Sequence, residues 1–274
     1  MSVHRSVRAV LGVGAALLLV VGCSAGGGTP DGTSSDSRRP GSEAAPPGQD
    51  PVARTKPSPR PTAPDYTLRP SRFPTDTAGA LRMARRIALE PSKFGPGFTR
   101  GEPFEDDPRR WAVLDSRCVW QRAALPPRVL TSLAQHSVLP AQGGKGAVEV
   151  VSVISVHRDV DSADQELATT LEEVLRCPRQ QLSADEEVTD LISASNPWGK
   201  RGQRTTDDQV WEMGTYTDHG TGESTPYVWG TSRLGTITTS VTILGGKGFA
   251  SGVLEKTMAV SLSELATNVK RELA

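Results

Sequence analysis

The stretch VEVVSVISVH, residues 148–157, decides the fold class of this 274-residue chain. Six of its ten residues are Val or Ile, whose β-branched side chains favour the extended conformation. The apolar character is almost continuous along the stretch, which is typical of a strand with both faces covered. We therefore expect a strand in the interior of a sheet.

The segment after this strand, DSADQELATTLEEVLRC (161–177), has the spacing of a helix. Its apolar positions recur at helical intervals: Leu167, Leu171 and Val174. Ser162 and Gln165 have the spacing of a capping box, and Pro178 follows the last helical position. We expect one helix whose leucine stripe packs on the sheet.

Three later runs are rich in strand-forming residues: DQVWEMGTYT (208–217), TPYVWGTS (225–232) and TITTSVTIL (236–244). Short turn-forming segments separate them, so they predict an antiparallel meander. In the last run Ile237, Val241 and Ile243 alternate with Thr238, Ser240 and Thr242. This alternation predicts one buried face and one solvent-exposed face.

Helical spacing also appears towards both ends of the chain. A long amphipathic helix is predicted at the C-terminus from its apolar positions: Leu254, Met258, Leu262, Leu265, Val269 and Leu273. Residues 75–89 predict a helix capped by Thr75 or Asp76, and PPRVLTSLAQ (126–135) predicts another. The fold class is therefore α+β, with a mostly antiparallel sheet that contains a C-terminal three-stranded meander and is covered by helices.

Composition divides the chain into three parts. Residues 1–22 hold Arg5 and Arg8 and then thirteen residues without a polar side chain, which is the profile of a signal peptide. A helix of that length covers about 20 Å, too short for a hydrocarbon core of about 30 Å. Residues 23–74 carry eleven of the 21 prolines and predict a disordered tether, and residues 75–274 predict one domain.

Cys23 follows Val20, Val21 and Gly22, and this context resembles a bacterial lipobox. The resemblance implies that Cys23 receives a diacylglyceryl group and becomes the new N-terminus. Two acyl chains give stable anchoring, so we expect a protein held at the extracytoplasmic face of the cell membrane. The alternative is a plain secreted protein in which this cysteine is incidental.

The charge of residues 75–274 excludes one class of partner. This region has 22 Arg and Lys residues against 26 Asp and Glu, and the basic residues do not cluster. A nucleic-acid-binding protein needs a basic surface that neutralises phosphates. We therefore expect no nucleic-acid partner, and we expect a monomer whose contact with the membrane is the lipid anchor.

Two cysteines remain in the predicted domain, Cys118 and Cys177. An even pair in an exported protein predicts a disulfide, which would stabilise the fold by about 4 kcal/mol in the chain-entropy model. A catalytic thiol and a metal-binding pair are the alternatives. Neither cysteine lies in a C-x-x-C motif.

Sequence motifs for catalysis are absent: the chain contains no G-x-S-x-G, no S-x-x-K and no H-E-x-x-H. The domain histidines His136, His157 and His219 have no carboxylate or histidine at metal-ligand spacing. We expect no metal site and no cofactor, and the sequence leaves open whether the protein is an enzyme.

Aromatic residues gather in and just before the meander, and they suggest a ligand-binding groove. The candidate residues are Trp198, Trp211, Glu212, Tyr227, Trp229 and Arg233. Aromatic side chains on a sheet face are usually part of a core, which is the alternative interpretation. An apolar groove with a polar rim would suit a cell-envelope glycan, a peptide or a lipid.

The order of elements, the cysteine in DSRCVW (115–120) and a second cysteine at a helix end resemble the extracellular sensor domain of the PknH-like mycobacterial kinases. The words CVWQR, NPWG, TTDDQVWEMG and GGKGF also resemble actinobacterial lipoproteins of unknown function. These resemblances imply an extracytoplasmic ligand-binding or sensor-like interaction module. The rival predictions are an envelope enzyme of unrecognised class and a structural envelope protein without a ligand.

Overall fold

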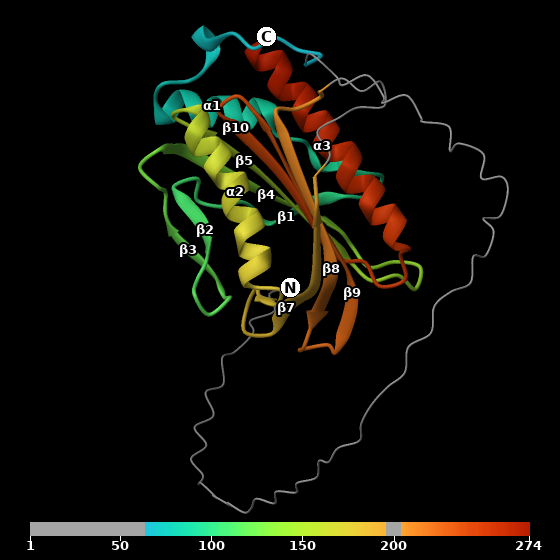
Figure 1. Cartoon of the computed structure of the whole chain (residues 1–274). Helices are drawn as coiled ribbons and strands as arrows, with labels where there is room; N and C mark the ends of the chain where they lie inside the picture. The colour runs from blue at the N-terminus through green and yellow to red at the C-terminus, as the bar shows by residue number, and fades with distance from the viewer. Residues whose placement is uncertain (1–63, 196–203) are drawn as a thin grey trace, which may run out of the picture. The chain divides into compact units, whose positions relative to one another are not determined.

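The computed structural model describes residues 64–195 and 204–274 (Figure 1). Cys23, the predicted signal peptide and most of the predicted tether lie outside the described residues. In chain order the elements are η1 (Pro70–Arg72), α1 (Thr77–Ile87), η2 (Pro91–Phe94), β1 (Thr99–Glu105), β2 (Arg110–Leu114), β3 (Trp120–Ala124), β4 (Val129–Leu139), β5 (Val148–His157), α2 (Val160–Arg176), β6 (Gln180–Gln181), β7 (Glu186–Ala194), β8 (Asp208–Asp218), β9 (Glu223–Leu234), β10 (Ile237–Gly245) and α3 (Ser251–Leu273).

Eight strands form one sheet in the order β1-β4-β5-β10-β9-β8-β7-β6, and every neighbouring pair is antiparallel. The predicted strand at 148–157 is confirmed as β5, which lies inside the sheet between β4 and β10. The predicted meander is confirmed as β8, β9 and β10. With the long C-terminal helix α3, these elements confirm the α+β fold class.

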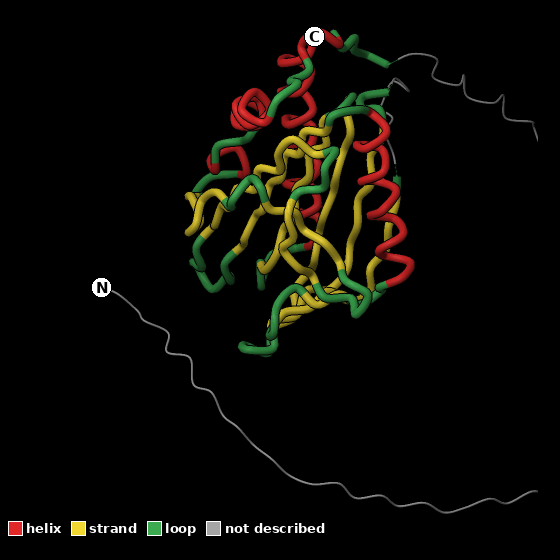
Figure 2. The backbone as a smooth tube through the Cα atoms, turned by 90° about the vertical axis from the view of Figure 1, so that its left-hand side faces the viewer, coloured by secondary structure: helices red, strands yellow, loops and turns green. Residues whose placement is uncertain are grey.

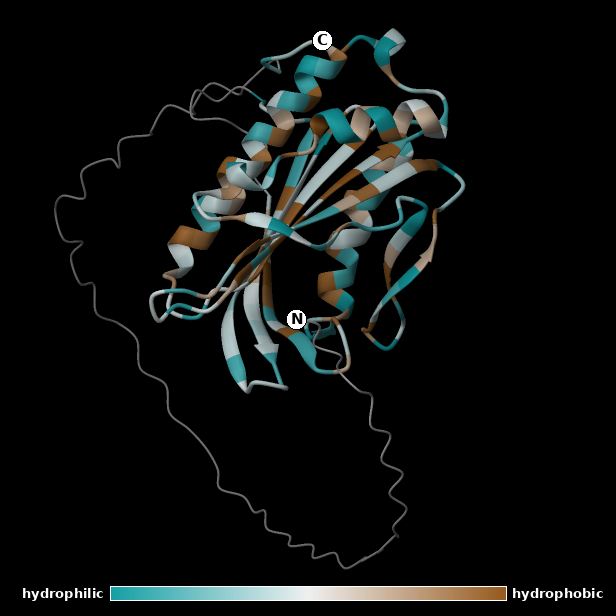
Figure 3. Ribbon diagram, turned by 180° about the vertical axis from the view of Figure 1, so that it is seen from behind, coloured by the Kyte–Doolittle hydropathy of each residue, from teal (hydrophilic) through white to brown (hydrophobic). Residues whose placement is uncertain are grey.

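One face of the sheet packs against α1 and α3 and forms the hydrophobic core. Val150 lies opposite Ile243 across β5 and β10, and both side chains are fully buried in this core. Gly230 on β9 allows α3 to approach closely, because a Cβ atom there would lie 2.6 Å from Leu262 Cδ1. Figure 3 views the molecule from this side and shows hydrophobic and hydrophilic residues alternating along α3.

The opposite face carries α2 and the small two-stranded hairpin β2–β3. Figure 2 shows helices on both sides of the strands. Asp159, not the predicted Ser162, is the N-cap residue of α2, since its side chain accepts the Ser162 N–H. The predicted apolar stripe is partly wrong: Leu167 is buried but Leu171 is 41% exposed.

The helix predicted at residues 126–135 is wrong, because this segment leads into β4. β4 pairs with β5 along most of its length and with β1 on its other side. Backbone pairing on both edges outweighs the helical spacing of Val129 and Leu133, since local propensity is weaker than tertiary context. The strands β1 and β7, which are rich in polar residues, were not predicted.

The predicted solvent exposure of one face of β10 is also wrong. The face of β10 that carries Thr238, Ser240 and Thr242 was predicted to be solvent-exposed. Thr238 is buried, and the other two side chains are half-buried. The reason is that this face of the sheet is covered by α2, whose Glu166 accepts a hydrogen bond from Thr238.

Residues 64–74 lie on the domain, although the sequence analysis assigned them to the tether. Tyr66, Leu68 and Phe73 pack against the hydrophobic core. Arg69 N–H also donates to the carbonyl of Leu273 at the end of α3 (2.7 Å). No helix of the described ranges is long and apolar enough to cross a membrane.

Candidate functional site

The predicted ligand-binding residues lie on two different faces of the sheet. Glu212 pairs directly with Trp229 across β8 and β9, so their side chains share a face. Trp211 pairs with Gly230, the residue that contacts α3, and therefore lies on the opposite face. Trp198 lies outside the described residues.

Four of the predicted residues share the face that α2 covers: Glu212, Tyr227, Trp229 and Arg233. Arg233 lies at the far end of this row and contacts Asp164 of α2 (3.3 Å) and Asp207 (3.2 Å). The nearly buried guanidinium of Arg233 forms ion pairs with both carboxylates. The pair with Asp164 links the start of α2 to β9. This is a structural role that the sequence analysis did not predict.

A group of hydrogen-bonded polar side chains lies between α2 and the sheet. His157 on β5 is 1% exposed, and its Nε2 lies 2.8 Å from Glu166 Oε2 on α2. Thr238 on β10 donates to the same oxygen at 2.6 Å. We refer to the residues His157, Glu166, Glu173, Glu212 and Thr238 as the polar layer.

Two carboxyl groups of the polar layer hold protons more tightly than usual. Burial raises the pKa of Glu212, which is 5% exposed, to about 7, although the Ser193 hydroxyl partly offsets this by donating to Oε1 (3.2 Å). Burial likewise raises the pKa of Glu173 to about 6, against the opposing charge of Arg176. The negative charge of Glu173 raises the Glu212 pKa further. Strongly perturbed carboxyl groups of this kind are common at functional sites.

Sequence reasoning missed Glu166 and Glu173, although a signal was available. They are seven residues apart on α2, with Thr170 between them, so they share one side of the helix. Cys177 lies four residues beyond Glu173 and is fully buried, which fixes this side as the inner one. A glutamate stripe in line with a buried cysteine would have indicated a polar interface beneath α2.

A pocket of about 390 Å³ lies beside the start of α3, away from the polar layer. Its lining residues are Met213, Gly214, Thr215, Ser224, Thr225, Pro226, Tyr227, Val228, Ser251 and Glu255. Of the predicted binding residues, Tyr227 contributes to it. The lining is mainly apolar with a few hydroxyl groups and one carboxylate, which is the usual character of a small-molecule pocket. We call it the β8–β9 pocket.

The titratable groups with raised pKa values and the β8–β9 pocket lie in different parts of the molecule. The groups with raised pKa values lie between α2 and the sheet, whereas the β8–β9 pocket adjoins α3. A metal centre finds no support in the described ranges, where no three His, Cys, Asp or Glu side chains gather in a suitable cluster. The arrangement offers a place for a ligand and, elsewhere, a proton-binding layer.

No family model matches the chain, and no curated protein matches it either. Among solved structures, an uncharacterised protein from Mycobacterium smegmatis, described as the Rv0999 ortholog, is similar at 13% sequence identity with a TM-score of 0.35. The similarity covers 69% of this chain and 96% of that one. A likeness of this degree carries no argument about function.

Proposed function

We propose that this protein is a membrane-anchored extracytoplasmic lipoprotein whose domain binds a small apolar or amphiphilic ligand, as a sensor-like module would. The β8–β9 pocket is the observation that carries the binding proposal. Its volume of about 390 Å³ is within the range of small-molecule pockets, and Met213, Pro226 and Val228 give it apolar walls. The sequence context of Cys23 and the resemblance to PknH-like sensor domains support the location and the sensing role.

At the β8–β9 pocket the geometry favours binding over catalysis. An enzyme would need its titratable groups to converge where a substrate can lie. In the part of the chain that the structure describes, Glu173 and Glu212 lie on the α2 side of the sheet, while the β8–β9 pocket adjoins α3. Two alternatives to a ligand-binding protein are an envelope enzyme and a structural protein without a ligand.

The test is a thermal-shift screen of the chain from residue 23 onward, carrying Cys23→Ser so that it is not lipidated. Envelope lipids below their micellar concentration, peptides and glycans are the probes. A ligand at a hundred times its Kd raises the melting temperature by about 5–10 °C for a domain of this size. Shifts with lipids or apolar peptides are expected, and no shift with any probe would contradict the proposal.

A matched pair of variants locates the binding. Thr215→Trp fills the β8–β9 pocket and should abolish the shift. Thr267→Trp introduces the same bulk at an exposed position of α3, outside the pocket lining, and should keep the shift. Equal shifts in both variants would place the ligand elsewhere.

Anchoring is tested separately by mass spectrometry of the protein from an envelope fraction. We expect the N-terminal residue to be Cys23 with a diacylglyceryl group on its sulfur, and we expect Cys23→Ala to be lost from the membrane fraction. An unmodified Cys23 in the membrane fraction would exclude the lipoprotein proposal and leave the binding proposal standing.

A further inference from the structure

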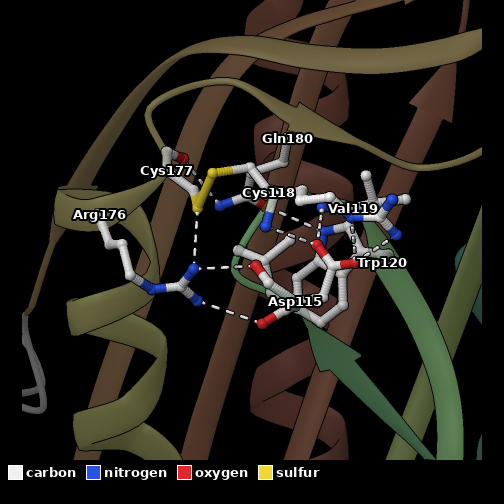
Figure 4. The surroundings of a disulfide bond; sticks show 9 residues. Asp115, Cys118, Val119, Trp120, Arg176, Cys177 and Gln180 are labelled. Atoms are coloured by element: carbon white, nitrogen blue, oxygen red, sulfur yellow. Dashed lines mark hydrogen bonds and ion pairs between the residues drawn. A yellow bond between two sulfur atoms is a disulfide. The ribbon is translucent and has the colours of Figure 1, made fainter.

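The Cys118–Cys177 disulfide joins the β2–β3 loop to the end of α2 (Figure 4). The predicted disulfide is thereby confirmed. Its two sulfur atoms belong to residues in different surroundings, since Cys177 is fully buried and Cys118 is half-buried. In thiol–disulfide exchange, access decides which sulfur a thiolate attacks. Access therefore favours attack at Cys118.

A pocket of about 220 Å³ opens beside this cysteine. Its lining residues are Arg117, Cys118, Arg179, Gln181, Glu186, Glu187 and His219, and Cys177 is not among them. The lining holds two arginines and two glutamates, and Arg179 pairs with Glu187 (2.7 Å), so the pocket gives an incoming thiolate space beside the sulfur without an excess of either charge. The pocket offers an incoming thiolate a route to Cys118 Sγ.

The other sulfur has a cationic neighbour. Arg176 Nη1 donates to Cys177 Sγ (3.3 Å), as the dashed line in Figure 4 shows. The same guanidinium donates to the carbonyls of Asp115 (2.9 Å) and Leu114 (3.2 Å), and these bonds hold it in place. A neighbouring arginine stabilises a thiolate, and a more stable thiolate leaves faster. Cys177 is therefore the better leaving group.

Cys118 also has an unusual backbone. Its φ is 62°, in the left-handed region, which costs a residue with a side chain roughly 1–2 kcal/mol. Strained residues of this kind occur where the surrounding structure holds them in place, often at functional positions. Opening the disulfide removes one of the constraints that hold Cys118 in this conformation.

We propose that Cys118–Cys177 is an exchangeable disulfide whose partner is a dithiol–disulfide oxidoreductase. A thiolate of the partner attacks Cys118 Sγ, a bond forms between these two sulfur atoms, and Cys177 leaves as the thiolate beside Arg176. The partner's second thiol loses its proton and attacks the partner's first sulfur, so that Cys118 leaves as a thiolate. Both cysteines then take up a proton, and two electrons have passed from the dithiol to this protein. The reverse sequence forms the bond during folding.

Opening the bond removes the covalent link between the hairpin β2–β3 and α2, so that only non-covalent contacts remain, among them the bonds from Arg176 to the Leu114 and Asp115 carbonyls. A two-stranded hairpin is marginally stable alone, so this one depends on its contacts with the domain, including the Gln181 N–H that donates to the Cys118 carbonyl (2.8 Å). Trp120 Nε1 donates to Gln180 (2.9 Å), and the Trp111 ring lies edge-on to His157 with 6.2 Å between centroids. Reduction therefore loosens the cover over His157 and the polar layer. This inference does not depend on ligand binding at the β8–β9 pocket.

The role of Cys177 as the leaving group is tested by reduction with dithiothreitol under native conditions. The protein used is the chain from residue 23 onward with Cys23→Ser. We expect a rate that rises linearly with dithiothreitol and falls about three- to tenfold in Arg176→Gln. Arg158→Gln is the matched control, because Arg158 is also exposed and also donates to a backbone carbonyl, that of Pro127. Equal rates in the two variants, or a rate independent of dithiothreitol, would overturn the proposal.

A second measurement needs no arginine variant and stands even if Arg176→Gln fails to fold. The same chain is treated with limiting glutathione, the free thiol is alkylated, and the mixed disulfide is mapped by mass spectrometry. We expect glutathione on Cys118 in about tenfold excess over Cys177. Equal labelling, or a preference for Cys177, would overturn the assignment of the attacked sulfur.

Discussion

The two faces of the eight-stranded sheet are covered by different chemistry. The face towards α1 and α3 is a continuous hydrophobic core in which residues such as Ile154 and Leu265 are fully buried. The face towards α2 holds the polar layer and is tied to the hairpin β2–β3 by a disulfide. The first face is stabilised by apolar burial, whereas the second depends on individual polar contacts and one covalent bond.

This difference indicates where functional constraints act. A sequence selected for stability alone would cover both faces with apolar side chains, since buried polar groups need partners and buried charges are costly. Departures from that rule are expected at functional or strained sites. Two such departures lie on the α2 side: the carboxyl of Glu212 is buried, and Cys118, in the β2–β3 loop at the end of α2, has a left-handed backbone. We therefore expect substitutions on the two faces to change the free energy of unfolding by different amounts.

Removing the disulfide should have the largest effect. Cys118 and Cys177 are 59 residues apart in sequence. Closing a loop of this length stabilises a fold by about 4 kcal/mol in the chain-entropy model. We expect Cys118→Ala with Cys177→Ala to lose about that much in urea unfolding. A loss below about 1 kcal/mol would show that the α2 face does not depend on the covalent bond.

A cavity in the hydrophobic core should cost slightly less. Ile154 on β5 is fully buried between the sheet and the helices α1 and α3. Ile154→Ala removes three carbon atoms from a close-packed site and should destabilise the protein by about 3 kcal/mol. Ile192→Ala is the matched control, because Ile192 is 65% exposed and its loss should change the free energy of unfolding by less than about 0.5 kcal/mol.

The hydrophobic face could be predicted from the sequence because its signals are periodic. The β-branched run of β5 and the alternation in β10 identify residues that are buried beneath α1 and α3, respectively. Strand periodicity also separates Trp211 from Glu212, because adjacent residues of a strand point to opposite faces. These two residues could therefore not belong to one groove, and the sequence analysis did not use that fact.

The polar face could not be predicted in the same way. The glutamates of α2 indicate a polar inner side of this helix, but nothing in the local sequence shows that Glu166 meets His157 of β5 and Thr238 of β10. The helix predicted at 126–135 failed for a related reason, since pairing of β4 with β1 and β5 is long-range. The disulfide was an exception because two cysteines in one domain allow a single pairing.

The buried carboxyl of Glu212 should make stability depend on pH. Its pKa is raised from 4.5 to about 7, so the folded state binds this proton more tightly than the unfolded state. The contribution of Glu212 to stability is therefore greatest below about pH 4.5, falls as the pH rises towards 7, and is constant above that value. Glu212→Gln should remove this part of the pH dependence and stabilise the protein at pH 8 by about 3 kcal/mol.

Thermal unfolding between pH 5 and pH 8 measures this effect. Glu90→Gln is a suitable control, because the Glu90 side chain is 71% exposed and pairs with Arg100 at the surface (3.3 Å). It should retain the fall in stability between pH 5 and pH 7. Parallel pH profiles for the wild type and Glu212→Gln would contradict the assignment of a raised pKa to this carboxyl.

Two glycines, one on each face, should show the smallest difference. A Cβ atom at Gly214, on the α2 face, would lie 2.6 Å from the carbonyl oxygen of Thr189. A Cβ atom at Gly230, on the α3 face, would lie 2.6 Å from Leu262 Cδ1 and 2.7 Å from Met258 Sδ. The distances are alike, but a backbone carbonyl in a strand cannot move aside as the end of a side chain can.

We therefore expect Gly214→Ala to cost about 2 kcal/mol and Gly230→Ala about 1 kcal/mol, both within the range for overpacked positions. Both glycines lie on paired strands of the same meander, so the loss of backbone freedom in the unfolded state is similar in the two variants and cancels in the comparison. Urea unfolding of both variants measures the difference. A larger cost at Gly230 would mean that the packing between β9 and α3 is the more rigid of the two, because Leu262 and Met258 could then not adjust.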